Sequence, residues 1–389
     1  MTRNNMSSAL FLTCFILVTT LGELRSFSLL LLLITIFVVL SITVRSNISH
    51  NSLLFSLLLS LSLLSCIFFV TCSILCFFII FEFRLAPITF LIFIFGYQPE
   101  KLSASTYLLV YTVLGSLPLF WYIVQHPGFL WSSFSALTPM TSLFVTVSFI
   151  VKSPLYTLHT WLPKAHTEAP LLGSMLLSGI LLKFGGYGIL VLAPSLLGST
   201  NIYIYLSILG GLICSVLCFR CWDMKSLVAY SSIVHIGAVT LGCLRGLEIG
   251  VCLALCAILS HSLVSPVLFL IAYEIYLSTT SRSFIVMHRI SITSSYLLVV
   301  AAFSGLNLGL PPSLGFWVEL ALVEALGSIW YSRLFPLVLV SYFAFVFSLF
   351  LYLRSCGGPL GAYSLTNTNL YPYLPSFVYS LILPLAACY

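Results

Sequence analysis

The chain has 389 residues, of which 60% are hydrophobic and only 6% charged, and its formal net charge is +6. Because soluble globular domains carry about a quarter charged residues, this composition excludes the soluble class and predicts a polytopic membrane protein. The apolar runs are continuous and do not alternate as barrel strands do, so the expected fold class is all-α. The basic residues are scattered singly, which argues against a nucleic-acid partner.

Thirteen apolar segments are predicted as membrane-spanning helices. In chain order they cover residues 9–22, 27–44, 52–70, 73–95, 105–124, 139–158, 170–193, 202–219, 227–243, 249–275, 294–329, 335–354 and 371–388. The run near the N-terminus is followed by another span and not by a small-residue cleavage pattern, so we interpret it as a retained helix.

Two of these regions are predicted to be helices broken inside the membrane. The segment 294–329 is longer than one span and contains Pro311 and Pro312, and the region 139–170 contains Pro154 and Pro163. A break of this kind is tolerated where it lines a cavity or is buried in protein. We therefore expect both breaks to mark functional positions.

The two broken segments suggest an internal repeat within one membrane domain, 1–389. Each lies in a block of about five spans, 52–193 and 202–354, flanked by shortened N-terminal helices in 1–51 and a C-terminal helix in 355–389. Paired discontinuous helices in corresponding positions indicate inverted repeats with an ion site near the bilayer midplane. The pattern predicts a transport function.

The charges of the loops predict the orientation of the chain. One side collects Arg3, Arg45, Lys101, Lys164, Arg220, Lys225, Arg282, Arg289 and Arg354. The other side collects Arg25, Arg245 and Arg333. By the positive-inside rule the N-terminus lies inside, and an odd number of spans places the C-terminus outside.

Ionisable residues inside the spans are the candidate functional groups. They are Glu82, Arg84, Lys152, Lys183, His235, His261, Glu274, Glu319 and Glu324. Charged and titratable groups at bilayer depth commonly mark ion paths and proton relays. A lysine that extends to the interface and hydrogen-bonded core histidines are the structural alternatives.

Lys152 and Glu82 are predicted to form an ion pair, with Arg84 neutralising Glu82. Burial weakens a lysine's hold on its proton and a nearby carboxylate strengthens it, so moving the carboxylate can switch the amine between holding and releasing a proton. A histidine is suited to pass the proton on. Glu319, in the second broken segment, is the expected terminal acceptor.

Other polar groups receive weaker assignments. Serines beside the two histidines are expected to hold ordered water along a path; they are Ser231, Ser232, Ser260, Ser262 and Ser265. The charges of the turn at 159–168 are expected at the inside surface, beside a possible water entrance; they are His159, Lys164, His166 and Glu168. The cysteines at 214, 218 and 221 are expected to be buried hydrophobes, since no second cluster completes a metal site.

The stretch VKSPLYTLHTWLPKAHTEAPLLGSMLLSGILLKFGGYG, at 151–188, resembles the signature of one family of antiporter-like proton-pumping subunits of respiratory complex I, NADH:ubiquinone oxidoreductase chain 4. The resemblance extends to FEFRLAPI, GYQPEKLSASTYLLVYTVLGSLPLF, DMKSLVAYSSIVHIG, SHSLVSPVLF and LNLGLPPSLGFWVEL. It covers most of residues 75–330, and the two ends match in hydropathy alone.

The resemblance implies a proton relay formed by Glu82, Lys152, Lys183, His235, His261 and Glu319. Glu82 and Lys152 would be the coupling pair, and Lys183 the central lysine. The sister antiporter-like subunits carry a lysine where Glu319 stands. Family members usually have fourteen spans, so this chain is expected to lack the first.

The resemblance also implies the surroundings of the chain. Its partners would be other membrane-arm subunits, including the sister antiporter-like chains, together with lipids of the mitochondrial inner membrane, with the N-terminus on the matrix side. NADH, FMN, iron–sulfur clusters and ubiquinone would be bound by other subunits, and no cofactor or metal is expected in this chain. A stand-alone cation/proton antiporter of the same fold and a structural membrane scaffold are the alternatives.

Overall fold

The computed structural model describes residues 52–71, 73–126, 138–192, 201–244, 248–284, 290–291, 294–327, 331–356, 363–364 and 373. The helices expected in 1–51 lie outside these residues, as does the last predicted span except for Tyr373. The described part is helical, apart from a parallel pair of two-residue strands, β1 (Ile290–Ser291) and β2 (Tyr363–Ser364).

The first half of the described chain contains the following helices: α3 (Ser52–Val70), α4 (Ile74–Phe83), α5 (Leu85–Phe95), α6 (Lys101–Gln125), α7 (Pro139–Lys152), α8 (Trp161–Glu168), α9 (Leu171–Leu176), the π-helix η3 (Leu177–Leu181) and α10 (Lys183–Leu192). The second half contains α11 (Asn201–Arg220), α12 (Met224–Leu244), α13 (Glu248–Thr279), α15 (Ser294–Leu308), α16 (Leu314–Gly327) and α17 (Tyr331–Cys356).

In the described part, 7 helical stretches are long and apolar enough to cross a membrane, and shorter apolar helices accompany them. Each segment predicted between residues 52 and 354 overlaps one to three helices, although the segment 139–158 extends beyond the end of α7 at Lys152. The predicted and observed helices agree because the bilayer interior offers no water to bond to. A backbone in hydrocarbon must form its hydrogen bonds internally, so a sufficiently long, continuously apolar run forms a helix.

The first predicted break lies between α7 and α8. Helix α7 ends at Lys152, where Pro154 lacks the N–H group that would continue the ladder. The end of a helix leaves carbonyl groups without a helical partner, and the carbonyl of Val151 accepts a hydrogen bond of 3.0 Å from the indole Nε1 of Trp161. A carbonyl group that the break leaves without a helical partner is therefore hydrogen-bonded by a side chain inside the protein.

The second break separates α15 from α16. Gly309 has a φ of 70°, the left-handed conformation that glycine adopts without a steric cost. The N–H groups of Gly309 and Leu310 donate back to the carbonyls of Leu306 and Gly305, at 3.2 and 3.1 Å, which is the Schellman pattern of a helix end. This turn ends α15 before α16 begins, and the two N–H groups at the turn remain hydrogen-bonded.

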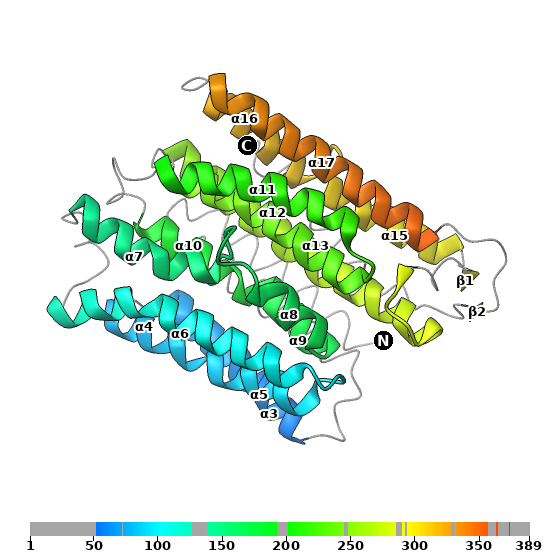
Figure 1. Cartoon of the computed structure of the whole chain (residues 1–389), viewed down its shortest axis with the longest axis horizontal. Coiled ribbons are helices and arrows are strands. Elements are labelled where there is room, and N and C mark those ends of the chain that lie inside the picture. The colour runs from blue at the N-terminus through cyan, green and yellow to red at the C-terminus, as the bar shows by residue number, and fades with distance from the viewer. Residues whose placement is uncertain are drawn as a thin grey trace, which may run out of the picture.

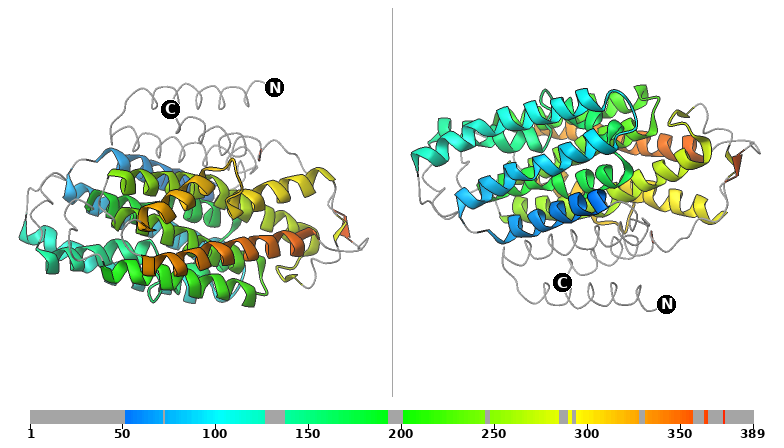
Figure 2. Two further views of the ribbon diagram at one scale, coloured as in Figure 1. Left: turned by 90° about the horizontal axis from the view of Figure 1, so that it is seen from above. Right: turned by 90° about the horizontal axis from the view of Figure 1, so that it is seen from below.

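The helices run roughly parallel to one another, and the most buried of them lie in the middle (Figures 1 and 2). In Figure 1, α3 to α6 lie at one side and α15 to α17 at the other, with α10, α12 and α13 between them. The central spans Leu171–Leu192, Met224–Leu244 and Gly250–Thr279 are 83%, 83% and 89% buried, whereas the outer span Leu334–Ser355 is 28% buried. The central helices are therefore shielded from lipid.

Helices α7 and α10 pack closely enough to exclude a side chain at Gly185. A Cβ atom there would lie 2.6 Å from the backbone N of Ser153 and 2.7 Å from the carbonyl O of Phe149. We expect Gly185→Ala to force the two helices apart and to destabilise the protein by about 1–3 kcal/mol, the usual cost of overpacking. The amount of assembled protein and its thermal midpoint measure this effect.

Gly237 on α12 provides a matched control. A Cβ atom there would lie 3.4 Å from the Ser207 carbonyl O, an ordinary contact distance. Gly237→Ala should therefore leave the thermal midpoint almost unchanged. An equal effect of the two substitutions would show that the α7–α10 approach is not the reason for glycine at position 185.

Candidate functional site

A buried ion pair joins α4 to α7. The Lys152 Nζ lies 2.7 Å from Oε1 of Glu82 and donates a second hydrogen bond of 2.9 Å to the carbonyl of Phe81. The same ammonium lies 3.1 Å from the centroid of the Phe81 ring. Lys152 is the last residue of α7, and the negative end of a helix favours a cation. The two residues that the sequence suggested as a pair are thus in contact.

Arg84 is near Glu82 without forming an ion pair with it. The ion pair of Glu82 in the described part of the chain is with Lys152. Arg84 is 2% exposed, and its guanidinium lies against aromatic rings, with Cζ 3.3 Å from the ring centroid of Phe184. The charges of Glu82 and Arg84 therefore act on each other without a direct contact, and Lys152 makes the direct contact with the carboxylate.

A π-helix positions the second buried lysine. Helix η3 (Leu177–Leu181) ends immediately before α10, whose first residue is Lys183, and the N–H of Leu182 donates to the carbonyl of Leu177 at 3.2 Å. Such turns shift the backbone ladder and are frequent at functional sites. Here the carbonyl of Ser178 accepts a hydrogen bond from the Lys183 ammonium. The sequence offered no signal for this π-helix.

Lys183 also contacts His261 on α13. The Nζ atom lies 2.8 Å from Nδ1 of the imidazole, and the two residues are 4% and 7% exposed. This geometry serves two protonation states, an ammonium that donates to a neutral imidazole and an imidazolium that donates to a neutral amine. The contact can therefore hold one proton at either residue and pass it between them.

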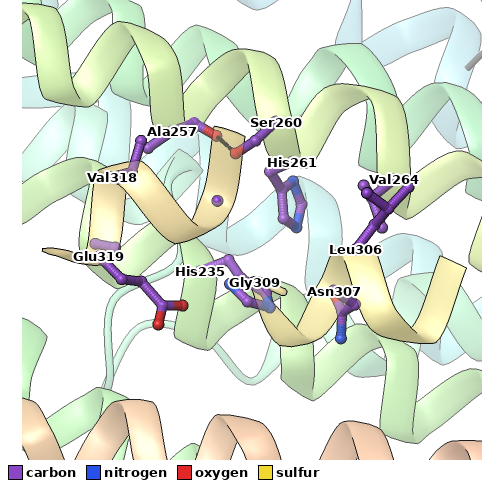
Figure 3. Close-up of a pocket in the computed structure, with 12 residues that line it drawn as sticks. His235, Ala257, Ser260, His261, Val264, Leu306, Asn307, Gly309, Val318 and Glu319 are labelled. Atoms are coloured by element: carbon purple, nitrogen blue, oxygen red, sulfur yellow. Dashed lines mark hydrogen bonds between the residues drawn. The ribbon is translucent and has the colours of Figure 1, made fainter. Parts of the chain in front are cut away.

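His235 continues the path from His261. The two ring centroids are 5.9 Å apart, and both residues line a cavity of about 40 Å³ that Glu319 also lines. Figure 3 shows His261 above His235, with Glu319 from α16 on one side of the cavity. One ordered water needs roughly 10–15 Å³, so this cavity has room for water between the histidines and the carboxyl group.

Asn307 is a polar residue of this cavity that the sequence analysis did not single out. It lies near the end of α15, just before the break, and it is 7% exposed. Its Nδ2 atom and the Nε2 atom of His235 are buried without a hydrogen-bond partner in the described part of the chain. Both residues line the cavity where water fits (Figure 3). Its place in a proline-broken segment was the signal that could have identified it.

The serines contribute less than expected. Hydroxyl groups of four of them donate to carbonyls three residues back on their own helices; these are Ser231, Ser232, Ser260 and Ser262. This pattern is common for serine within helices. Ser260 lines the cavity, and the Ser265 Oγ is buried without a partner in the described region. The oxygens of the four back-bonded serines remain available as acceptors only.

The turn at 159–168 is only in part the surface feature that the sequence suggested, because Lys164 is exposed whereas His159 is 7% exposed. His166 is fully buried and Glu168 is 5% exposed. The His166 ring stacks on Phe269 of α13, with centroids 4.5 Å apart, and both ring nitrogens lack a hydrogen-bond partner among the described residues. The charges of Lys225 and Lys183 both act on this ring. His166 is therefore an additional titratable group beside the central lysine.

Two cationic side chains, Arg282 and Lys225, hydrogen-bond to carbonyl groups at the C-terminal end of α8. The last carbonyls of a helix lack helical partners and carry partial negative charge. Arg282 Nη1 donates to the carbonyl of Thr167 at 2.5 Å, and the Lys225 Nζ donates to that of Ala169 at 3.1 Å. Lys225 lies at the start of α12 and Arg282 in the segment that follows α13, so residues from other parts of the chain hydrogen-bond to the junction of α8 and α9.

Together the predicted site residues form a row across the molecule, here called the ionisable row: Glu82, Lys152, Lys183, His261, His235 and Glu319. It passes from α4 through α7, α10, α13 and α12 to α16, from one side of Figure 1 to the other. Direct contacts join the first pair and the second pair. Lys152 and Lys183 are not hydrogen-bonded to each other, although α7 and α10 pack closely at Gly185. Protons could move along the whole row only if water bridged the gaps between these contacts.

Comparison with known proteins identifies the family of the chain. Residues 71–348 match the family described as NADH:quinone oxidoreductase/Mrp antiporter, TM. A protein of Albinaria caerulea named NADH-ubiquinone oxidoreductase chain 4 is 34% identical over 356 residues, covering 87% of this chain and 81% of the relative. The protein of the same name from Artemia franciscana is 40% identical over 271 residues, covering 68% and 70%.

The chain belongs to the NADH-ubiquinone oxidoreductase chain 4 family. The resemblance drawn from its motifs is thereby confirmed.

Solved structures share the fold of this chain 4 family member. A chain of respiratory complex I from Thermus thermophilus with bound NADH superposes with a TM-score of 0.80 at 21% identity, covering 92% of this chain and 80% of the other. A chain of the Mrp complex from Dietzia sp. superposes with a TM-score of 0.79 at 19% identity, covering 92% and 42%. At these identities the likeness establishes a common helical architecture.

Proposed function

We propose that the chain is a proton-translocating membrane-arm subunit of NADH:ubiquinone oxidoreductase, respiratory complex I, in the mitochondrial inner membrane. Family membership supports the assembly. The observation that supports the activity is the ionisable row, in which buried or half-buried titratable side chains from separate helices meet in two direct contacts and one shared cavity. Groups of this kind inside a membrane protein mark proton relays.

The geometry supports a sequence of proton movements along the row. Electron transfer in other subunits separates Glu82 from Lys152, and the ammonium then lacks the charge that stabilised it. Its proton or its field acts on Lys183, which passes its own proton to His261 across their 2.8 Å contact. The proton crosses the cavity beside His235 to Glu319, which releases it. The residue roles are those proposed from the sequence.

The same proposal includes the architecture beyond the described residues. It comprises thirteen spans in one membrane domain, with inverted repeats at 52–193 and 202–354, and the N-terminus on the matrix side. Breaks at the ends of α7 and α15 occur in corresponding positions of the two blocks and support the repeats. Sister antiporter-like chains and other membrane-arm subunits are the partners, and NADH, FMN, iron–sulfur clusters and ubiquinone bind to other subunits.

Glu319→Gln tests the terminal step. The amide keeps the shape of the carboxyl group but cannot take up and release a proton, so proton translocation by the assembled complex should fall to about one-tenth or less, because positioned acid–base groups contribute typically 10²–10⁴-fold. The measurement is the acidification of sealed vesicles per NADH oxidised. Glu324→Gln on the same helix is the control, since Glu324 is exposed and does not line the cavity.

Equal pumping by the Glu319→Gln and parent complexes would remove Glu319 from the relay. The antiporter alternative makes a separate prediction. A stand-alone cation/proton antiporter, purified without other subunits, would exchange Na⁺ or K⁺ for protons in liposomes. We expect no exchange by the isolated chain, because the proposed switch at Glu82 and Lys152 is driven from outside it.

A further inference from the structure

Arg84 carries a buried charge that the relay described above does not use. It lies at the junction of α4 and α5 and is 2% exposed. Its Nε and Nη1 atoms are buried and have no hydrogen-bond partner among the described residues. An arginine stays protonated in proteins, so a full positive charge stands in the protein interior with two unused donors.

Aromatic rings compensate this charge only in part. The Arg84 Cζ lies 3.3 Å from the ring centroid of Phe184, 5.3 Å from that of Phe68 and 5.5 Å from that of Phe81. A cation–π contact contributes about 0.5–2 kcal/mol, whereas the effective cost of burying an ion is several kcal/mol. The position is therefore one in which a carboxylate would be strongly favoured as a partner.

Glu82 is the carboxylate whose charge acts on Arg84. In the described state it pairs with Lys152, whose ammonium lies on the same Phe81 ring that Arg84 approaches. The Glu82 carboxylate thus lies near two cations, Lys152 and Arg84, and forms an ion pair with Lys152. Glu82 is also the less buried member of its pair, with a side chain 21% exposed against 5% for Lys152, so it has more room to move.

The backbone between Glu82 and Arg84 is suited to a change of contact. Residues two apart on a regular helix do not face each other, but the helix is interrupted here. Arg84 is the turn residue between α4 and α5, and Pro87 follows it. A proline lacks the N–H group that would bond four residues back and displaces the carbonyl at that position, which is Phe83. The interruption falls between the two side chains.

We propose that Arg84 is a positioning residue that offers the Glu82 carboxylate a second binding place. Glu82 alternates between Lys152, as in the described structure, and the unused Nε and Nη1 donors of Arg84. This inference rests on the proposed function, because it supplies the ion-pair switch with its other stable position. When the carboxylate binds Arg84, Lys152 is left without a counter-charge and gives up its proton more readily.

Two neutral substitutions of Arg84 test this proposal in the assembled complex. Arg84→Met and Arg84→Gln both remove the second position, so Glu82 stays with Lys152 and proton translocation per NADH oxidised should fall at least about fivefold, a coupling loss of about 1 kcal/mol from RT ln 5. Arg84→Lys keeps the charge and should retain more than half of the parent value.

The neutral variants are expected to assemble in normal amounts, because replacing an unpaired buried charge removes a desolvation cost. Failure of both to assemble would overturn the proposal, since Arg84 would then be a structural anchor. Parent-like pumping in Arg84→Met or Arg84→Gln would also overturn it, as would equal loss of pumping in Arg84→Lys. If Lys183→Met lacks pumping in the same assay, the relay stands and only the role of Arg84 is wrong. If Lys183→Met pumps normally, the proposed function itself fails.

Discussion

Replacing Lys183 with methionine is expected to abolish proton translocation by the assembled complex without loss of assembly. The ammonium has hydrogen bonds to the Ser178 carbonyl and to Nδ1 of His261, and it is the point where the two halves of the ionisable row meet. Methionine fills a similar volume but binds no proton. Removing a cation buried without a carboxylate partner in the described chain also lowers the desolvation cost of folding.

Vesicle acidification per NADH oxidised and the amount of assembled complex together measure this effect. Lys164→Met is the matched control, because Lys164 lies on exposed surface of α8 with its ammonium 3.6 Å from the ring centroid of Tyr107. The control should pump normally. Normal pumping by Lys183→Met in a fully assembled complex would exclude the relay and favour a scaffold role for the chain.

Glu82 and Lys152 should show strong coupling in a double-substitution cycle. Glu82→Gln leaves the buried Lys152 ammonium without its carboxylate partner, which typically costs about 3–5 kcal/mol. Lys152→Met should cost less, because the Glu82 side chain is 21% exposed and can bind Arg84 instead. The double variant removes both charges from the 2.7 Å contact, so its thermal midpoint should return close to the parent value. Proton translocation should remain lost in all three variants, because the double variant has no pair to open.

The thermal midpoint and the pumping ratio therefore separate stability from function at this pair. Additive losses of stability in the double variant would show that the two residues act independently in the folded protein. Recovery of pumping together with stability would show that the pair is structural, and that Lys183 receives its signal by another route.

Hydropathy alone predicted the helices because a continuously apolar segment cannot cross a membrane as a loop or an open strand. A backbone in hydrocarbon cannot bond to water, so each long apolar run between 52 and 354 had to be helical, and the prolines at 154, 311 and 312 marked where the spans are interrupted. The same argument singled out the buried lysines, histidines and carboxyl groups, because charged groups at bilayer depth are rare unless they function.

Apart from the pair of Glu82 and Lys152, the sequence did not predict which of these groups contact each other, because those contacts depend on the tertiary structure. Lys183 and His261 are 78 residues apart in the chain, and their meeting depends on the π-helix before Lys183 and on the rotation of α10 against α13. The same holds for Arg84, which packs against aromatic rings, and for His166, which is buried on Phe269.

The sequence by itself therefore determined which segments between 52 and 354 form apolar helices and which residues are unusually polar for such segments, since both follow from the local cost of transfer into hydrocarbon. Only the tertiary structure decided which side chain each charge meets. Partner choice depends on how helices are rotated and how closely they approach, and small residues far from the charges, such as Gly185, control that approach.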